Sequence, residues 1–226
     1  MIESDPLLAA TDFLDYQEPS VRAFVARATA DARDERERAV ALYYAVRDDL
    51  RYEIYDADLS RGGMRASSVI AARSGLCIHK SIVYAAAVRA VGIPSRLVLT
   101  DVRNHLASPR LKDFIGGDVF HYHCLVAVRL GGTWLKVTPV FNRRLCQLYG
   151  MAPLDFDGTG DSLHHPYDDV GKRYMEFVRE HGAFDDLPYE TIVAGMRAAH
   201  PRLFAGADRL RSGALAREAP DALNPS

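Results

Sequence analysis

The segment that most constrains the fold is an apolar helix held between two glycine breaks, in the stretch "ARSGLCIHKSIVYAAAVRAVGIPSR", residues 72–96. Helix-forming residues run from Cys77 to Val91, directly after a Ser-Gly break. Gly92 and Pro94 then end the helical pattern. The β-rich run "SRLVLTDV" follows at residues 95–102 and predicts a strand. A cysteine is therefore placed at the first position of a long helix that leads into a sheet.

The flanking segments predict helices first and a sheet second. Residues 19–51 carry helical spacing on both sides of the charge run "DARDERER", which reads as a solvated linker or a helix start. A short helix is expected at "SSVIAAR" with Ser67 or Ser68 as its cap, and a loop over 104–119. "HYHCLVAVRLGGTWLKVTPVF" predicts a β-hairpin around a Gly-Gly turn. This order indicates an α+β fold.

Signals weaken beyond residue 142. "RRLCQLYG" predicts one short helix, and "GKRYMEFVREHG" fits helix or strand. "LPYETIVAGMRAAH" predicts a helix with Pro188 in its first turn, and about the last 20 residues read as a frayed tail. We expect a single domain over 1–226, with a core at about 35–142 and a C-terminal extension at about 143–226.

Charge and cysteine content exclude several classes of protein. A net charge of −2 gives no basic face for nucleic acid. The most apolar run, Ser81 to Val91, is too short for a membrane span and contains Arg89. The acidic N-terminus lacks the order of a secretion signal, and three cysteines without paired spacing fit free thiols in a reducing compartment. The sequence therefore predicts a cytoplasmic location.

Cys77 and a histidine of the hairpin are candidates for nucleophilic catalysis. Helix N-termini present free N–H groups and partial positive charge, which stabilise a thiolate. A burial role as a small hydrophobe is the alternative for this cysteine. His121 and His123 lie two apart in the first strand, so simple alternation places both on one face of the sheet. Either can be a structural histidine, but beside a thiolate one of them can act as its base.

These segments resemble the motifs of the transglutaminase-like superfamily, which has a papain-like core. "SGLCIHKSIVYAAAVRAVGIPSRLV" is similar to the family's Gly-x-Cys helix followed by Gly-Ile-Pro-x-Arg. "HCLVAVRLGGTWLKVTP" is similar to its histidine strand, glycine turn and tryptophan, and the spacing to Trp134 selects His123. The resemblance implies that the Cys77 helix packs on an antiparallel sheet and that Cys77 and His123 are catalytic.

One position departs from the family pattern. Thr138 stands where the family usually has the aspartate that orients the histidine. A threonine hydroxyl can accept a hydrogen bond from imidazole but brings no charge to stabilise imidazolium. Asn142, or Asp155 or Asp157 from the following loop, can take that role, or the site can be weak or inactive. The run "KVTPVFN" is similar to a bacterial subgroup that carries threonine here, which favours a working variant.

The resemblance also implies an oxyanion hole and an activity. The backbone N–H of Cys77 would share that hole with an upstream donor, for which Tyr52 and Tyr55 are candidates, although core packing also explains both. The predicted function is acyl transfer through a Cys77 thioester, most simply hydrolysis of a peptide or protein amide, as in a cysteine protease or amidase. Transfer to an amine would instead cross-link. No cofactor, metal or calcium loop is expected.

Two other readings of these residues compete with the enzyme. His121 and His123, with Cys77 and His79, can be combined into a mixed zinc site, but no standard ligand spacing is present, and residues two apart on a helix point in different directions. A non-catalytic binding module would explain the missing aspartate. A binding module, however, gives no chemical reason for the presence of both Cys77 and His123.

Overall fold

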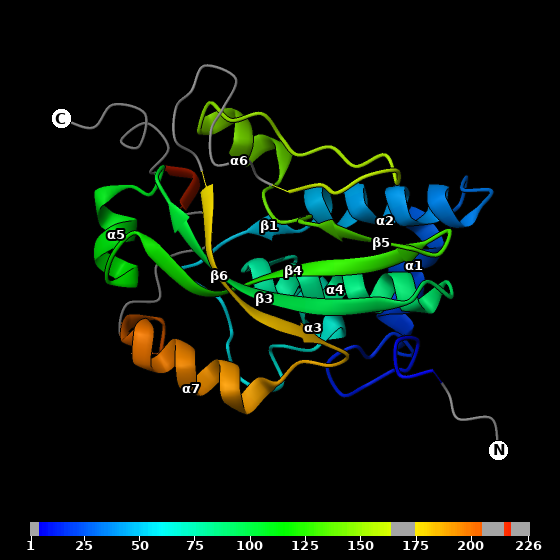
Figure 1. Ribbon diagram of the computed structural model, residues 1–226, viewed down its shortest axis with the longest axis horizontal. Helices are drawn as coiled ribbons and strands as arrows, with labels where there is room; N and C mark the ends of the chain where they lie inside the picture. The colour runs from blue at the N-terminus through cyan, green and yellow to red at the C-terminus, as the bar shows by residue number, and fades with distance from the viewer. Residues whose placement is uncertain (1–4, 164–174, 205–214, 218–226) are drawn as a thin grey trace.

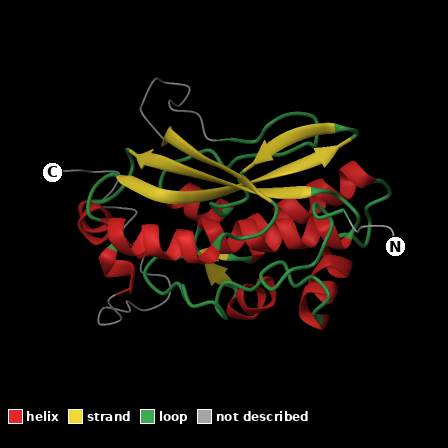
Figure 2. Cartoon of the chain, turned by 60° about the horizontal axis from the view of Figure 1, so that its bottom comes forward, coloured by secondary structure: helices red, strands yellow, loops and turns green. Residues whose placement is uncertain are grey.

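The computed structural model describes residues 5–163, 175–204 and 215–217. It forms two layers, with the helices gathered on one face of an antiparallel sheet (Figure 2). The helices are α1 (Pro19–Ala28), α2 (Glu35–Asp49), α3 (Ala66–Ala72), α4 (Cys77–Ala90), α5 (Pro109–Ile115), α6 (Arg143–Leu148), α7 (Tyr189–Ala199) and the 3₁₀ turn η1 (Pro201–Phe204). The strands are β1 (Arg51–Tyr52), β2 (Ser74–Gly75), β3 (Ser95–Asn104), β4 (Val119–Leu130), β5 (Thr133–Val137) and β6 (Met175–Phe184).

Helix α4 is the centre of the core and lies behind β3 and β4 in Figure 1. Every residue from Cys77 to Arg89 is buried, including the polar His79, Lys80, Ser81 and Arg89, so the apolar residues are not confined to one face. The helix ends where Gly92 adopts a left-handed φ of 83°, a conformation that costs a glycine little. The predicted helix, its glycine stop and the strand after it are all confirmed.

The main sheet has the order β5-β4-β3-β6, with all neighbours antiparallel. The predicted hairpin is β4–β5, paired from Leu130 and Thr133 back to Val126 and Val137 around the Gly-Gly turn. The α+β prediction is confirmed. A separate two-residue parallel pair, β1–β2, aligns Tyr52 with Gly75 and so brings the strand after α2 to the start of α4.

The charge run after α1 starts α2. The Asp34 carboxylate accepts the N–H of Glu37 at 2.8 Å, and the Glu37 carboxylate accepts the N–H of Arg33 at 2.7 Å. These reciprocal bonds satisfy donors that the first helical turn leaves free. The two helices predicted within 19–51 are therefore α1 and α2, and the charges serve as cap and first turn.

Several local predictions were wrong or incomplete. Arg65, not Ser67 or Ser68, is the N-cap of α3, because Ser67 lies inside the helix and bonds Asp15. The expected loop at 104–119 contains α5, capped by Ser108. The ambiguous segment at 171–182 overlaps β6, and most of the expected tail lies outside the described residues. Among the described helices, none has the length and apolar character to cross a bilayer.

Candidate active site

Cys77 is the first residue of α4 and is completely buried. Its sulfur is approached by the backbone N–H groups of Cys77 itself, Ile78 and Cys124. Two of these donors belong to the free N-terminus of α4, as the sequence predicts. The third belongs to β4, where Cys124 directly follows His123. The thiol thus sits against the strand at the position next to His123.

The end of the hairpin makes room for the helix at this point. Strand β5 ends at Val137, which pairs with Val126 of β4 and also bridges to Ser162. Cys124, two residues beyond Val126, bonds to α4: its carbonyl accepts the hydroxyl of Ser81 at 2.8 Å. The N-terminal part of α4 therefore bonds the backbone of Cys124, which lies in β4 beyond the residues that pair with β5.

The Ser-Gly break before Cys77 has a packing reason. A Cβ on Gly75 would lie 2.5 Å from the Cβ of His79, so only glycine fits. The His79 ring then accepts the N–H of Leu76 at 3.2 Å and bonds the carbonyl of Asp58 at 2.9 Å through its other nitrogen. His79 is thus a structural residue that holds the turn before Cys77.

Burial outweighs the helix terminus in setting the ionisation of Cys77. Removal from water raises the pKa of the Cys77 thiol to about 11, although the three N–H groups act in the opposite direction. The thiolate predicted at neutral pH is therefore wrong for this conformation. The helix terminus is visible in the sequence, but the burial that raises the pKa of the thiol is not. In the structure Cys77 carries its proton at pH 7.

His123 is a buried residue of β4 that pairs with Thr100 of β3. Burial lowers the pKa of His123 to about 4, so its imidazole is neutral at pH 7 and can accept a proton. Its ring centroid lies 6.4 Å from that of Phe177. Within the described part of the chain, no hydrogen bond involves the His123 ring, so its nitrogens have no partner that fixes a tautomer.

A β-bulge separates His123 from His121. The β3–β4 register shifts between Thr100 and Val102, and Tyr122 takes a left-handed φ of 59°. Its N–H bonds the Asp101 carboxylate at 3.1 Å, and the His121 ring pairs with the same carboxylate at 3.1 Å. Bulges re-aim neighbouring side chains. The simple alternation expected for the two histidines therefore does not describe this strand.

The four candidates for orienting His123 have different surroundings. Thr138 is buried, and its hydroxyl has no hydrogen-bond partner. Asn142 accepts the N–H of Tyr52 at 3.2 Å. Asp155 pairs with Arg47 at 3.1 Å. Asp157 accepts the N–H of Thr159 at 2.8 Å. None of the four bonds His123 among the described residues, and Thr138 is the one whose side chain is not engaged elsewhere.

The unpaired hydroxyl of Thr138 has a testable cost. We expect Thr138→Val to raise the free energy of unfolding by about 1 kcal/mol, since it removes a buried unsatisfied group with little change of shape. Ser81→Ala is the comparison variant, because the buried hydroxyl of Ser81 donates to the carbonyl of Cys124. Its loss should lower the free energy of unfolding by about 1 kcal/mol. Urea unfolding of both variants measures the difference. A loss of stability in Thr138→Val would mean that the hydroxyl has a partner.

Of the two tyrosines considered for the oxyanion hole, Tyr52 lies near the thiol. Burial, followed by the nearby Cys77 sulfur, raises the pKa of Tyr52 well above its ordinary value. Its ring also meets Phe141 edge-on, with centroids 4.7 Å apart. Tyr55 instead packs against Phe114, with centroids 4.8 Å apart. Of these two tyrosines, Tyr52 is therefore the one near the start of α4, where it pairs with Gly75.

The residues of the zinc alternative have separate partners. His121 binds Asp101, and His79 binds the backbone on both sides of its ring. The described residues contain no cluster of three or more potential ligands arranged around one point. Trp134, whose spacing selects His123 in the family motif, is 38% exposed at the hairpin turn, beneath the guanidinium groups of Arg96 and Arg129.

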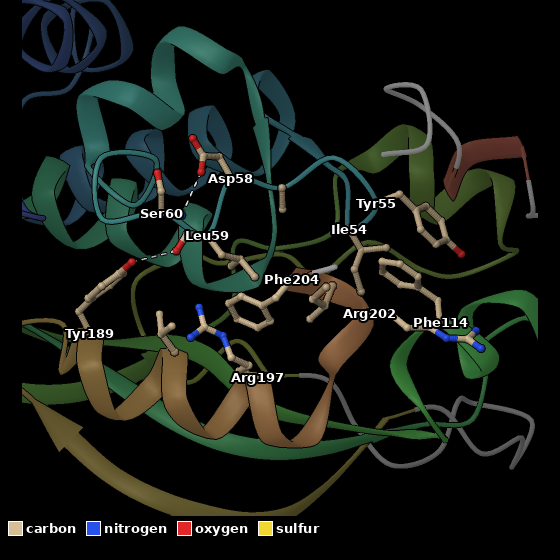
Figure 3. Close-up of a pocket in the computed structure, with 13 residues that line it drawn as sticks. Ile54, Tyr55, Asp58, Leu59, Ser60, Phe114, Tyr189, Arg197, Arg202 and Phe204 are labelled. Carbon is tan, nitrogen blue, oxygen red and sulfur yellow. Dashed lines mark hydrogen bonds between the residues drawn. The ribbon is translucent and has the colours of Figure 1, made fainter. Parts of the chain in front are cut away.

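A separate cavity of about 250 Å³ lies between the loop after β1, α5 and α7 (Figure 3). Arg197 and Phe204 line it from α7 and η1, and the hydroxyl of Tyr189 closes one side by bonding the carbonyl of Leu59 at 3.1 Å. None of the predicted catalytic residues lines it. It is therefore distinct from the Cys77 site.

The family model of the transglutaminase-like superfamily matches residues 22–139, just over half of the chain. The match includes Cys77, His123 and Thr138. The chain belongs to the transglutaminase-like superfamily. This confirms the resemblance drawn from the cysteine and hairpin motifs, and it places the α4–β4–β5 unit inside the family's shared core.

Comparisons with individual proteins are more distant. No curated protein matches the chain. A solved structure of a "putative cysteine protease" from Cytophaga hutchinsonii is 15% identical, with a TM-score of 0.46 over 62% of this chain and 44% of that chain. A "putative protease" from Parabacteroides distasonis is 14% identical, with a TM-score of 0.39 over 58% and 25%. This superfamily member thus spans less than half the length of either protein.

Proposed function

We propose that the protein is a cysteine enzyme that hydrolyses a peptide or amide bond through a thioester on Cys77. The observation that carries the proposal is the contact of the Cys77 sulfur with the backbone N–H of Cys124, the residue that follows His123 in β4. Membership of the superfamily supports the same assignment. Cys77 acts as nucleophile and His123 as base, and Thr138 stands at the third position.

The first half-reaction moves one proton from the thiol to the leaving amine. His123 accepts the Cys77 proton as the sulfur attacks the amide carbonyl carbon, and a tetrahedral oxyanion forms. The C–N bond then breaks, the amine leaves with the proton from His123, and a thioester stays on Cys77. The neutral imidazole of His123 at pH 7 is the form that this step requires.

The second half-reaction regenerates the thiol. His123 takes a proton from water, the hydroxide attacks the thioester carbonyl, and the C–S bond breaks as sulfur regains the proton. A carboxylic acid leaves. An amine in place of water would give transamidation by the same steps. The buried site favours small acceptors, and water is the smallest of them.

Tyr52 is proposed as the second donor to the oxyanion, together with the backbone N–H of Cys77. Tyr52→Phe keeps the ring against Phe141 and removes the hydroxyl. We expect it to lower kcat by roughly 10²-fold with little effect on KM, which is typical of an oxyanion donor. Steady-state kinetics on any cleaved peptide measures this. Tyr55→Phe is the matched control and should leave kcat unchanged, and equal losses in the two variants would contradict the assignment.

The experiment that tests the function supplies both acceptors at once. The protein is incubated with an unstructured protein such as casein, with and without a fluorescent primary amine, and the products are read by mass spectrometry. We expect new peptide ends and little amine incorporation. Dominant incorporation of the amine would identify a transamidase. The absence of both products would contradict acyl transfer on proteins.

Two observations favour a second function. The unpaired hydroxyl of Thr138 and the raised pKa of the Cys77 thiol are what a binding module with a retired site would show. Such a module would bind peptides without a covalent step. Detection of a thioester on Cys77 separates the two functions, since only the enzyme forms one.

A further inference from the structure

Leu215 is buried and is held in place by contacts with its backbone and its side chain. It is one of three described residues near the C-terminus, and it is 3% exposed. Its carbonyl accepts the hydroxyl of Tyr149 at 3.1 Å, and its N–H lies 3.5 Å from the buried carboxylate of Glu53. Leu215 lies in a helical turn over residues 215–217, and the two side chains bond its polar groups from outside that turn.

The pocket around Leu215 is apolar and almost filled. Tyr52, Phe141, Leu145 and Met151 are among its lining residues, together with Leu215 itself. About 40 Å³ of it is left unfilled. An aliphatic side chain is therefore what the pocket accommodates.

The same pocket lies near the start of α4. Tyr52, which lines it, pairs with Gly75 in the β1–β2 ladder, two residues before Cys77. Glu53 is tied to the turn that precedes α4, because its N–H bonds the carbonyl of Gly75 at 3.1 Å. One of the two groups that contact Leu215, Glu53, is therefore bonded to the segment that precedes Cys77.

We propose that this pocket is the subsite for an aliphatic side chain of a peptide substrate, and that Leu215 occupies it in the resting protein. The inference rests on the proposed function, since it names the substrate class of that site. A peptide subsite needs an apolar cavity together with polar partners for a backbone N–H and C=O. Glu53 and Tyr149 supply these partners to Leu215. Occupation by Leu215 also fits the complete burial of Cys77.

The test is the rate at which iodoacetamide alkylates Cys77 at mildly alkaline pH, with the adduct located by peptide mass spectrometry. Leu215→Ser should raise this rate roughly tenfold or more, because labelling scales with the fraction of molecules whose site is open. Tyr149→Phe, which keeps the ring and loses the bond to Leu215, should raise it by a smaller factor. Leu203→Ser, in the separate cavity, is the matched control and should label like the native chain.

Protection by small amides tests the class of ligand. In Leu215→Ser, N-acetyl-leucine amide should slow labelling of Cys77, and N-acetyl-glycine amide should not. Equal effects of the two amides overturn the aliphatic subsite. Unchanged labelling in both Leu215→Ser and Tyr149→Phe overturns occupation by Leu215, and Tyr149→Phe decides alone if the first variant does not fold.

Failure of the proposed function gives a different result. Adding His123→Ala to Leu215→Ser should slow the labelling if His123 is the base. Fast labelling that this second change does not alter would overturn the catalytic pair and leave the pocket and its occupant in place.

Discussion

Cys77→Ala is expected to abolish acyl transfer. Removal of the nucleophile eliminates the covalent intermediate, so the loss should be on the order of 10⁶-fold in kcat, down to the background of the assay. Peptide cleavage by the purified variant measures the loss. The methyl group of alanine is smaller than the thiol and leaves the apolar surroundings of α4 intact, so stability should change little.

Cys146→Ala is the matched control for this experiment. Cys146 is also a buried free thiol, and its sulfur contacts the carbonyl of Phe141 outside the proposed pair. Its loss should leave the rate within a factor of two or so, as expected for a residue that takes no part in the covalent step. Cleavage that survives in Cys77→Ala would refute the thioester mechanism, whatever the control shows.

His123→Ala is expected to cost a factor of roughly 10²–10⁴ in the rate of thioester formation, the usual contribution of a general base. The native rate should also fall as the pH drops through about 4, because protonation of His123 removes the base. The variant should not show that fall. Stopped-flow acylation across the pH range measures both effects, and a variant that retains the acid limb would exclude His123 as its origin.

The same pKa values bear on stability. The lowered pKa of His123 contributes stability that is present above its unfolded value near 6.5 and lost as the pH falls through about 4. The raised pKa of Cys77 contributes stability that is present below its unfolded value near 9 and lost as the pH rises through about 11. With respect to these two groups, the folded protein should therefore be most stable between about pH 6.5 and pH 9.

Local patterns in the sequence predict the central part of the fold well. The apolar run from Cys77 and its glycine stop specify α4, and the Gly-Gly turn specifies the β4–β5 hairpin. These features depend on residues that are neighbours in the chain. Residues 143–148 and 189–199 are also helices, as the weaker signals beyond residue 142 predict, and Pro188 is the N-cap of the second.

The parts that the sequence does not predict depend on contacts between distant residues. The bulge at Tyr122 requires the carboxylate of Asp101, 21 residues earlier in the chain. The ionisation of Cys77 depends on burial by several elements, which outweighs the helix terminus that the sequence reveals. The buried position of Leu215 depends on a contact with Glu53, 162 residues earlier in the chain. No local pattern carries that information.

The most direct test of the central claim, that Cys77 and His123 act as a pair, is acylation by p-nitrophenyl acetate at neutral pH. Intact-protein and peptide mass spectrometry locate the acetyl group and give its rate of appearance in the native chain and in His123→Ala. We predict a thioester on Cys77 that forms at least roughly 10²-fold faster in the native chain. Equal rates in the two proteins, or acetylation of Cys124 or Cys146 in place of Cys77, would contradict the catalytic pair.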